Sequence, residues 1–303
     1  MESSASSDET LGGTVFIGPK WRLLRPPKNR YHRALADHIR EPDVRDRLLI
    51  FIVNIAALLA GCVAPPPQRP AAHPPADVMV AAPPGAALYL PASAPDLYRL
   101  LPPPPEAGSA QQRAELDELL RLQATRTPAM VQRAREDVPR SIFRFADALG
   151  SPAEFTAQRL PLTARFFAQI EHDGAQYADR AKDVFARPRP FRSEPRLAPA
   201  VAEPSSPSYP SFHSTWAVAC GIVLADMVPE RRAAIFARAD EFAHNREVGG
   251  VHYPSDVAAG HLAGTALAEE FFSTPRFLAD EAAATTELRQ ALGLPPLPPR
   301  VVP

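Results

Sequence analysis

The side chains best suited to chemistry in this 303-residue chain begin with Arg246, His252 and Asp256, spaced by six and then four residues. Pro254 stands between the last two and is expected to open a helix, which would put Asp256 in its first turn. From there a carboxylate can reach back to the His252 ring. Such a pair fixes the tautomer of the imidazole and leaves its other nitrogen free as a nucleophile.

Two further cations lie upstream. Lys182 and Arg189 occur in the stretch KDVFARPRP, in which Pro188 and Pro190 prevent a helix from continuing. Lys182 is therefore expected on the last turns of a helix, and Arg189 in a rigid loop held by the two prolines. Arg187 with Pro188 forms a competing pair of the same type.

A second histidine follows in the stretch SYPSFHST, residues 208–215, which leads into an apolar segment. This pattern predicts a turn that enters a buried helix, with Ser211 and His213 at its start. Free backbone N–H groups and the positive end of the helix dipole favour an anion at such a position.

Together these residues predict a site for a phosphoryl group. Lys182, Arg189 and Arg246 supply donors for a tetrahedral oxyanion, and arginine can bind two phosphate oxygens at once. With His252 as nucleophile, a protonated His213 could give its proton to the departing alkoxide. The expected intermediate is a phosphohistidine, which water then hydrolyses.

The three stretches resemble those of the type-2 phosphatidic acid phosphatase superfamily, and within it the bacterial class A non-specific acid phosphatases. The family motifs are K-x6-R-P, P-S-G-H and S-R-x5-H-x3-D. Here they correspond to Lys182 with Arg189 and Pro190, to Pro210, Ser211, Phe212 and His213, and to Asn245 and Arg246 with His252 and Asp256. The resemblance extends over 101–109 and the helical sequence up to about residue 270.

The resemblance implies that His252 is the nucleophile, Asp256 its partner and His213 the general acid. It further implies that no metal or other cofactor is needed and that the substrates are small organic phosphomonoesters. The phosphate-binding residues would be Lys182, Arg189, Ser211, Phe212 through its backbone N–H, and Arg246.

Two positions depart from the family pattern. Phe212 replaces a glycine whose small size lets the substrate approach closely, and its ring is expected to reshape the pocket. Asn245 replaces a serine, and its amide can still donate a hydrogen bond. Activity is expected to persist with a shifted substrate preference.

The fold class expected is all-α: a single compact helical bundle of the acid phosphatase and vanadium haloperoxidase type. From about residue 109 to 290 the apolar spacing is helical and no alternating strand pattern occurs. The segment 213–227 is apolar nearly all round, which predicts a central buried helix. Further helices are expected over 111–126, 129–150, 152–169, 170–186, 229–246, 255–272 and 279–291.

Composition and the N-terminal sequence bound the remaining expectations. A formal net charge of −1 gives no electrostatic case for nucleic acid, and proline-rich clusters mark the edges of the domain. The basic residues before the apolar run 48–61 indicate an export signal, and the residues up to Cys62 resemble a lipobox. A plain secretory signal with an incidental cysteine is the alternative.

These features predict five segments: a mis-called start or disordered extension (1–43), a lipoprotein signal peptide (44–62), a linker (63–88), the helical phosphatase domain (89–291) and a proline-rich tail (292–303). The expected location is the periplasm or cell envelope, with membrane attachment only through a lipid on Cys62. Association into a homo-oligomer stays open.

Three alternatives share part of this pattern. An integral lipid phosphatase needs several apolar spans of about 20 residues, which this chain lacks apart from the signal. A vanadate-dependent haloperoxidase would bind vanadate where a phosphatase binds phosphate. A non-catalytic lipoprotein would bind phosphate or envelope polymers without turnover.

Overall fold

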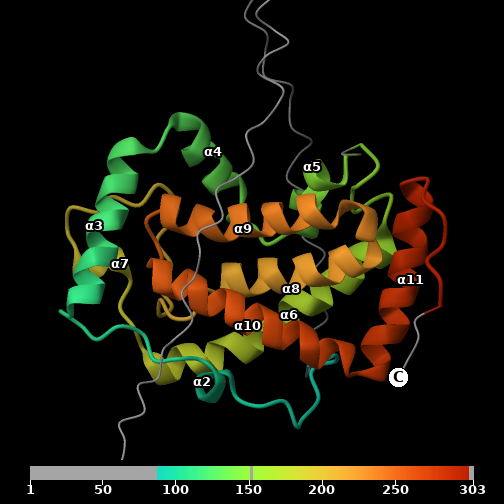
Figure 1. Ribbon diagram of the computed structural model, residues 1–303, viewed down its shortest axis with the longest axis horizontal. Helices are drawn as coiled ribbons and strands as arrows, with labels where there is room; N and C mark the ends of the chain where they lie inside the picture. The colour runs from blue at the N-terminus through green and yellow to red at the C-terminus, as the bar shows by residue number, and fades with distance from the viewer. Residues whose placement is uncertain (1–86, 151–152, 300–303) are drawn as a thin grey trace, which may run out of the picture. The chain divides into compact units, whose positions relative to one another are not determined.

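The computed structural model describes residues 87–150 and 153–299, and all regular secondary structure within these ranges is helical (Figure 1). The predicted all-α class is confirmed for this part of the chain. The predicted extension 1–43, the signal peptide 44–62 with Cys62, and residues 63–86 of the linker lie outside the described residues. No helix in the described ranges combines the length and apolarity that crossing a bilayer requires.

Four long helices form the centre of the described domain: α6 (Pro161–Phe185), α8 (Phe212–Met227), α9 (Arg232–Val248) and α10 (Pro254–Phe272). Helix α8 packs against each of the other three. Its side chains are buried on almost every face, from Trp216 near the start to Met227 at the end. The predicted central buried helix is therefore confirmed.

Prolines open several of the helices, because a proline at the first helical position has the required φ and lacks only an N–H that would be unpaired there anyway. Pro161, Pro254 and Pro275 take this position in α6, α10 and α11 (Pro275–Ala291). Helix α8 begins differently: Ser211 caps it by accepting a hydrogen bond from the N–H of Ser214.

Three expected helices are wrong in their limits. Residues 153–160 form turns, and α6 runs unbroken from Pro161 to Phe185 where two helices, 152–169 and 170–186, were expected. The expected helix 129–150 is interrupted near Pro139 into α4 (Pro128–Glu136), a 3-10 turn (Ile142–Phe145) and α5 (Ala146–Leu149). Proline explains both outcomes, because it starts a helix readily but removes a hydrogen bond inside one.

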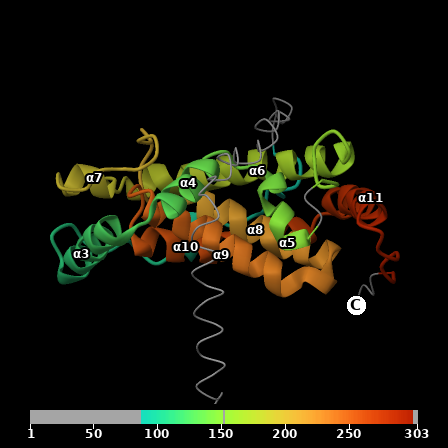
Figure 2. The same cartoon turned by 90° about the horizontal axis from the view of Figure 1, so that it is seen from above.

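Smaller elements lie around the central helices. Helix α2 (Leu97–Leu100) contacts α6, while α3 (Ala110–Thr125) and α4 contact α9. Helices α3 and α7 (Pro190–Ser193) lie at one end of the central helices, and α11 lies at the other (Figures 1 and 2). The first of these ends is where the predicted site residues meet.

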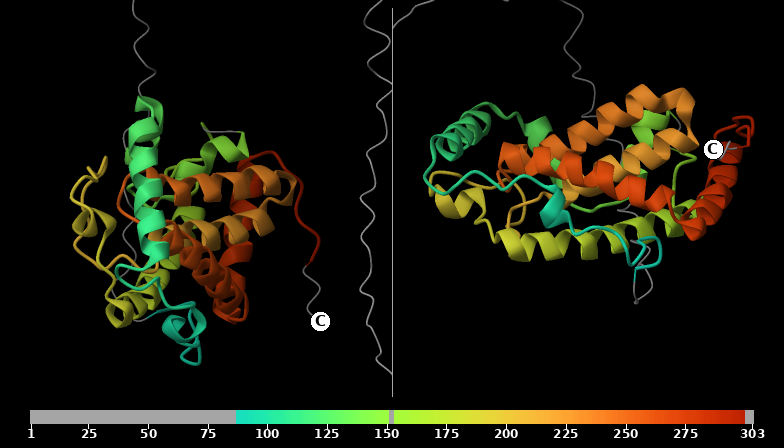
Figure 3. Two further views of the ribbon diagram at one scale, coloured as in Figure 1. Left: turned by 60° about the vertical axis from the view of Figure 1, so that its left-hand side comes forward. Right: turned by 60° about the horizontal axis from the view of Figure 1, so that its bottom comes forward.

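At that end α8 and α10 begin, whereas α6 and α9 end (Figure 3). The C-terminal turn of α6 meets the start of α8, because Lys182 donates a hydrogen bond to the carbonyl of Pro210 at 2.7 Å. The start of α8 meets the start of α10, because the N–H of Ser211 donates to the carbonyl of Asp256 at 3.0 Å. Two N-termini and two C-termini therefore surround one point.

Helices α8 and α10 approach each other closely through two glycines of α10. A Cβ added at Gly260 would lie 2.7 Å from the carbonyl oxygen of Ser211, and one at Gly264 would lie 2.5 Å from that of Thr215. Only glycine allows backbones to come this near. The glycines thereby fix the distance between the two helix starts that carry His213 and Asp256.

We predict that Gly264→Ala lowers the free energy of unfolding by ~1–3 kcal/mol, because the added methyl group must push α8 and α10 apart. Leu262→Ala on the same helix is the matched control, since its side chain is 55% exposed and its loss should matter little. Chemical denaturation of both variants measures the difference. Equal stability of the two would contradict the close-packing argument.

Candidate active site

His252 and Asp256 form the pair that the sequence predicts. Both side chains are buried, and Nδ1 of His252 lies 3.2 Å from Oδ2 of Asp256. Asp256 is the third residue of α10, and its Oδ2 also accepts the N–H of Tyr253 at 2.9 Å. One carboxylate therefore caps the helix and holds the imidazole with its proton on Nδ1.

The other ring nitrogen of His252 meets a cation. NH1 of Arg189 lies 2.7 Å from Nε2, and because a guanidinium can only donate, Nε2 accepts. Burial and the charges of Arg189, Lys182 and Arg246 keep the pKa of His252 well below its ordinary value. The imidazole is thus neutral at acidic pH, with its lone pair on Nε2, as a nucleophile requires.

Lys182 and Arg189 are held by loop carbonyls. The Lys182 ammonium donates to Pro207 and Pro210, and Arg189 donates to Ser206 and Val251. Burial and the neighbouring Arg189 lower the pKa of Lys182 to about 7, and burial lowers that of Arg189 to about 10. Both charges are therefore held in place at a cost that a bound anion would offset.

Arg246 has the most unusual surroundings. Its side chain is 2% exposed, and within the part of the chain that the structure describes, Nε and NH1 are buried without a hydrogen-bond partner. Burial, Arg189 and Arg140 lower its pKa to about 9, whereas Asp137 acts in the opposite direction. Buried donors without partners are rare in folded proteins, and here they indicate that a ligand completes the site.

Ser211 and His213 lie at the start of α8 as predicted. Oγ of Ser211 accepts the Ser214 hydroxyl at 2.8 Å, which leaves the hydroxyl proton of Ser211 available for donation. Nε2 of His213 lies 2.9 Å from the carbonyl oxygen of Val138 and so carries a proton. Burial, Arg246 and Arg140 hold the pKa of His213 well below its ordinary value.

The ring of Phe212 is accommodated by α6. A Cβ added at Gly174 would lie 3.3 Å from Cε2 of Phe212, so the ring occupies room that this glycine leaves. The guanidinium of Arg140 lies 4.8 Å from the centroid of the same ring and forms an ion pair with Glu171 at 2.6 Å. The ring of Phe212 therefore lies against a cation at the edge of the site.

Three residues around Asp256 were missed by the sequence reasoning or given no role in it. NH1 of Arg187 lies 2.5 Å from Oδ1 of Asp256, and its NH2 lies 2.9 Å from Glu115 of α3. The hydroxyl of Ser208 donates to Oδ2 of Asp256. The two arginines that competed in the sequence thus take different places, with Arg189 at His252 and Arg187 at Asp256.

With these contacts every oxygen of Asp256 is engaged. Oδ1 faces Arg187, while Oδ2 accepts from Ser208, from the N–H of Tyr253 and from His252. These contacts fix the orientation of the carboxylate, and through Oδ2 they fix that of the His252 ring.

The acidic and sulfur-bearing groups needed for a metal site are not gathered here. Across residues 87–150 and 153–299, no three or more His, Cys, Asp and Glu side chains are placed to hold a metal ion. What the described residues do gather is a set of buried cations around two imidazoles, which is chemistry suited to a phosphoryl group.

Comparisons with known proteins agree with this geometry. Residues 168–278, which include all the predicted catalytic and phosphate-binding residues, match the family model of the PAP2 superfamily. The chain is 30% identical over 209 residues to an acid phosphatase of Zymomonas mobilis, with 66% of this chain and 77% of the relative covered. It is 28% identical over 198 residues to a non-specific acid phosphatase of Providencia stuartii, with 60% and 76% covered.

Among solved structures, a bacterial vanadium-dependent iodoperoxidase aligns with 57% of this chain and 52% of its own, at 19% identity and a TM-score of 0.45. The likeness in sequence is more extensive, because this chain covers more than three quarters of each of these two acid phosphatases. The residues matched by the family model, 168–278, span the whole stretch from Lys182 to Asp256. The chain belongs to the PAP2 superfamily, among the relatives of the bacterial non-specific acid phosphatases.

Proposed function

We propose that this phosphatase hydrolyses small organic phosphomonoesters through a covalent phosphohistidine on His252, without a metal ion. That it is an acid phosphatase follows from its family. The observation that carries the proposal is the buried guanidinium of Arg246, whose Nε and NH1 have no partner among the described residues. A phosphate dianion would supply both the missing acceptors and the missing negative charge.

Binding of the substrate would exchange contacts of the free site for contacts with phosphate oxygens. Arg246 can bind two of them, and Lys182, Ser211 and the N-terminus of α8 face the same anion. In the free site, Arg189 donates a hydrogen bond to Nε2 of His252. When substrate binds, Arg189 would donate to a phosphate oxygen instead. The nucleophile is thereby released when the substrate arrives.

In the first chemical step, the lone pair on Nε2 of His252 attacks phosphorus, and the bond from phosphorus to the ester oxygen breaks. Asp256 stabilises the positive charge that develops on the imidazole, because its carboxylate lies at Nδ1. His213 gives a proton to the departing alkoxide from Nδ1, since its Nε2 is bonded to Val138. The bound dianion favours protonation of His213, because it offsets the nearby arginines.

In the second step, water attacks the phosphohistidine. His213, now neutral, takes a proton from this water as it adds to phosphorus. The bond from phosphorus to Nε2 breaks, and inorganic phosphate leaves with His252 restored to its starting tautomer. The buried cations stabilise the charge on the equatorial oxygens in both steps.

The first prediction of this mechanism concerns the nucleophile and the metal. The enzyme should hydrolyse p-nitrophenyl phosphate with excess EDTA present, and His252→Ala should lose essentially all turnover, because the variant lacks the nitrogen that attacks phosphorus. His261→Ala is the matched control, since this histidine is partly exposed on α10 and should be dispensable. Rapid quenching followed by mass spectrometry should find a phosphoryl group on the peptide that contains His252.

Turnover that EDTA abolishes would show that the metal-independent route is wrong. If the enzyme showed no hydrolysis but oxidised halide after loading with vanadate, the haloperoxidase reading would replace the proposal.

The second prediction concerns pH. With p-nitrophenyl phosphate, whose leaving group needs little help from the general acid His213, kcat/KM should fall as pH rises through about 7, because Lys182 loses its charge there, while burial and the nearby cations keep the pKa of His252 well below its ordinary value. In Lys182→Gln, kcat/KM should be lower throughout and its alkaline decline should move up, since the next cation, Arg246, has a pKa of about 9. The same substrate is used for both proteins, so its own ionisation cancels. An unchanged decline near pH 7 in the variant would contradict the assignment.

The third prediction concerns Phe212. Phe212→Gly should change the ratio of kcat/KM between aromatic and small alkyl phosphate esters several-fold, because it removes the ring beneath Arg140 and opens space beside Gly174. It should also destabilise the protein by ~3–5 kcal/mol, as loss of a buried aromatic side chain does. Phe212→Leu is the control that keeps volume and removes the stacked ring. An unchanged ratio in both variants would show that Phe212 has no part in substrate preference.

A further inference from the structure

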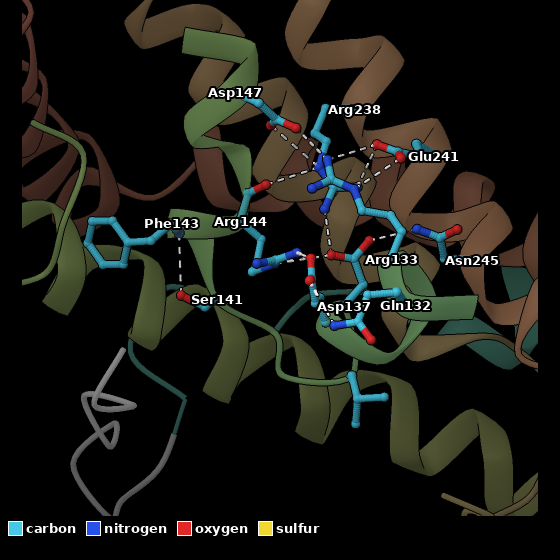
Figure 4. A network of polar contacts seen from close by, with 12 residues as sticks. Gln132, Arg133, Asp137, Ser141, Phe143, Arg144, Asp147, Arg238, Glu241 and Asn245 are labelled. Atoms are coloured by element: carbon cyan, nitrogen blue, oxygen red, sulfur yellow. Dashed lines mark hydrogen bonds and ion pairs between the residues drawn. The ribbon is translucent and has the colours of Figure 1, made fainter. Parts of the chain in front are cut away.

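A buried carboxylate outside the predicted site connects three parts of the fold. Asp137, which follows α4, is 0% exposed. Its Oδ1 accepts Arg238 at 2.5 Å and Arg144 at 3.2 Å, and its Oδ2 accepts the side-chain amide of Asn245 at 2.8 Å (Figure 4). Arg238 and Asn245 both belong to α9, two turns apart on one face of the helix. Asp137 therefore binds one face of α9 at two points, and the second of them, Asn245, directly precedes Arg246.

The outer part of the same network is exposed to solvent. Glu241 and Asp147 also contact Arg238, and both contact Arg133, but their side chains are 43% and 54% exposed. Exposed ion pairs of this kind contribute little. The network thus has a buried centre at Asp137 and a solvent-exposed edge at Glu241 and Asp147.

The chain that follows Asp137 reaches the catalytic histidine. The next residue, Val138, accepts Nε2 of His213 on its carbonyl oxygen at 2.9 Å. Two residues further, Arg140 pairs with Glu171 of α6 and lies over the ring of Phe212. The segment 137–140 is therefore fixed to α9 at one end and to α6 at the other, with the Val138 carbonyl between them.

We propose that Asp137 is a positioning residue for the phosphatase site: it fixes the Val138 carbonyl against Nε2 of His213 and, through Asn245, the end of α9 that carries Arg246. The inference rests on the proposed function, because it assigns to Asp137 an effect on the general acid and on a phosphate-binding cation. It also gives a role to Asn245, the second residue that departs from the family motif.

The negative charge of Asp137 supports the site as its hydrogen bonds do, because it favours the charged form of Arg246. Arg246 is surrounded by the cations Arg189 and Arg140, and Asp137 opposes their effect on its pKa. His213 faces Arg246, Arg140 and His252, and the hydrogen bond to Val138 opposes their effect on the pKa of His213. Without the carboxylate, both the anchor of the Val138 carbonyl and a charge that favours the ionised form of Arg246 are lost.

This role predicts an effect that depends on the leaving group. A general acid matters most when the departing oxygen is a strongly basic alkoxide, and least when it is a stable anion such as p-nitrophenolate. An error in the position of His213 should therefore slow the hydrolysis of glycerol 2-phosphate more than that of p-nitrophenyl phosphate. A loss of folded protein would reduce both rates by the same factor.

The experiment compares Asp137→Asn with Glu241→Gln, which removes a charge from the solvent-exposed edge of the same network. We expect kcat/KM for glycerol 2-phosphate to fall about tenfold further than that for p-nitrophenyl phosphate in Asp137→Asn, a part of the range that general acids contribute. Inhibition by inorganic phosphate should weaken in this variant, more at pH 8 than at pH 6. In Glu241→Gln, the ratio of kcat/KM between the two substrates and the inhibition by phosphate should both match those of the parent enzyme. Thermal unfolding confirms that each variant is folded.

Asn245→Ala serves as a second variant, because it leaves the contacts of Asp137 with Arg238 and Arg144 in place. It should weaken inhibition by phosphate several-fold, through Arg246, and leave the ratio between the two substrates unchanged. A folded Asp137→Asn with the parent's substrate ratio and phosphate inhibition would overturn the proposal. If Asp137→Asn does not fold, unchanged phosphate inhibition in Asn245→Ala would overturn it.

The failure of this inference is distinct from failure of the proposed function. If the parent enzyme hydrolyses neither ester, the phosphatase mechanism itself is wrong. If the parent hydrolyses both and the variants behave alike, the site is correct and Asp137 is only a structural anchor.

Discussion

The structure depends on holding three like charges together away from water. Lys182, Arg189 and Arg246 are buried within electrostatic reach of His252, and burial lowers the pKa of each of the three. Desolvated cations that repel one another are costly, so the surrounding fold must supply the compensating free energy. The loop carbonyls bonded to Lys182 and Arg189, and the buried helix α8, are the means by which it does so.

The same buried cations favour the binding of an anion. An anion that enters the site finds donors already oriented, and its negative charge relieves the repulsion among the cations. Burial and the same cations hold the pKa of His252 well below its ordinary value, so the feature suited to an anion also disfavours protonation of the imidazole that we propose as the nucleophile. Affinity for the anion and readiness of the nucleophile have one physical origin.

The part of this arrangement that local sequence determines could be predicted. Pro254 opens α10 and places Asp256 at its third position, four residues after His252, and the prolines after Lys182 end α6. These are short-range effects of proline and of helix periodicity, and they bring each motif residue to its place. The buried character of α8 was equally legible, because its residues are apolar on every face.

The contacts that could not be predicted join residues far apart in the chain. Glu115 meets Arg187 across 72 residues, and Asp137 meets Asn245 across 108. Nothing in the local pattern of α3 or α4 distinguishes these carboxylates from neighbours that face solvent. Their roles follow from how the helices pack, and the break of the expected helix 129–150 at Pro139 is what frees the segment after Asp137 to reach His213.

Gly174 and Phe212 show how a departure from the family motif is absorbed. The ring of Phe212 lies where a methyl group on Gly174 would stand only 3.3 Å away, so a larger residue on α6 and a phenyl ring on α8 compete for the same volume. The size of the residue at position 174 consequently limits the size of the residue at position 212, and the reverse is also true. Any redesign of the pocket has to treat them as one unit, in which space given to one helix is taken from the other.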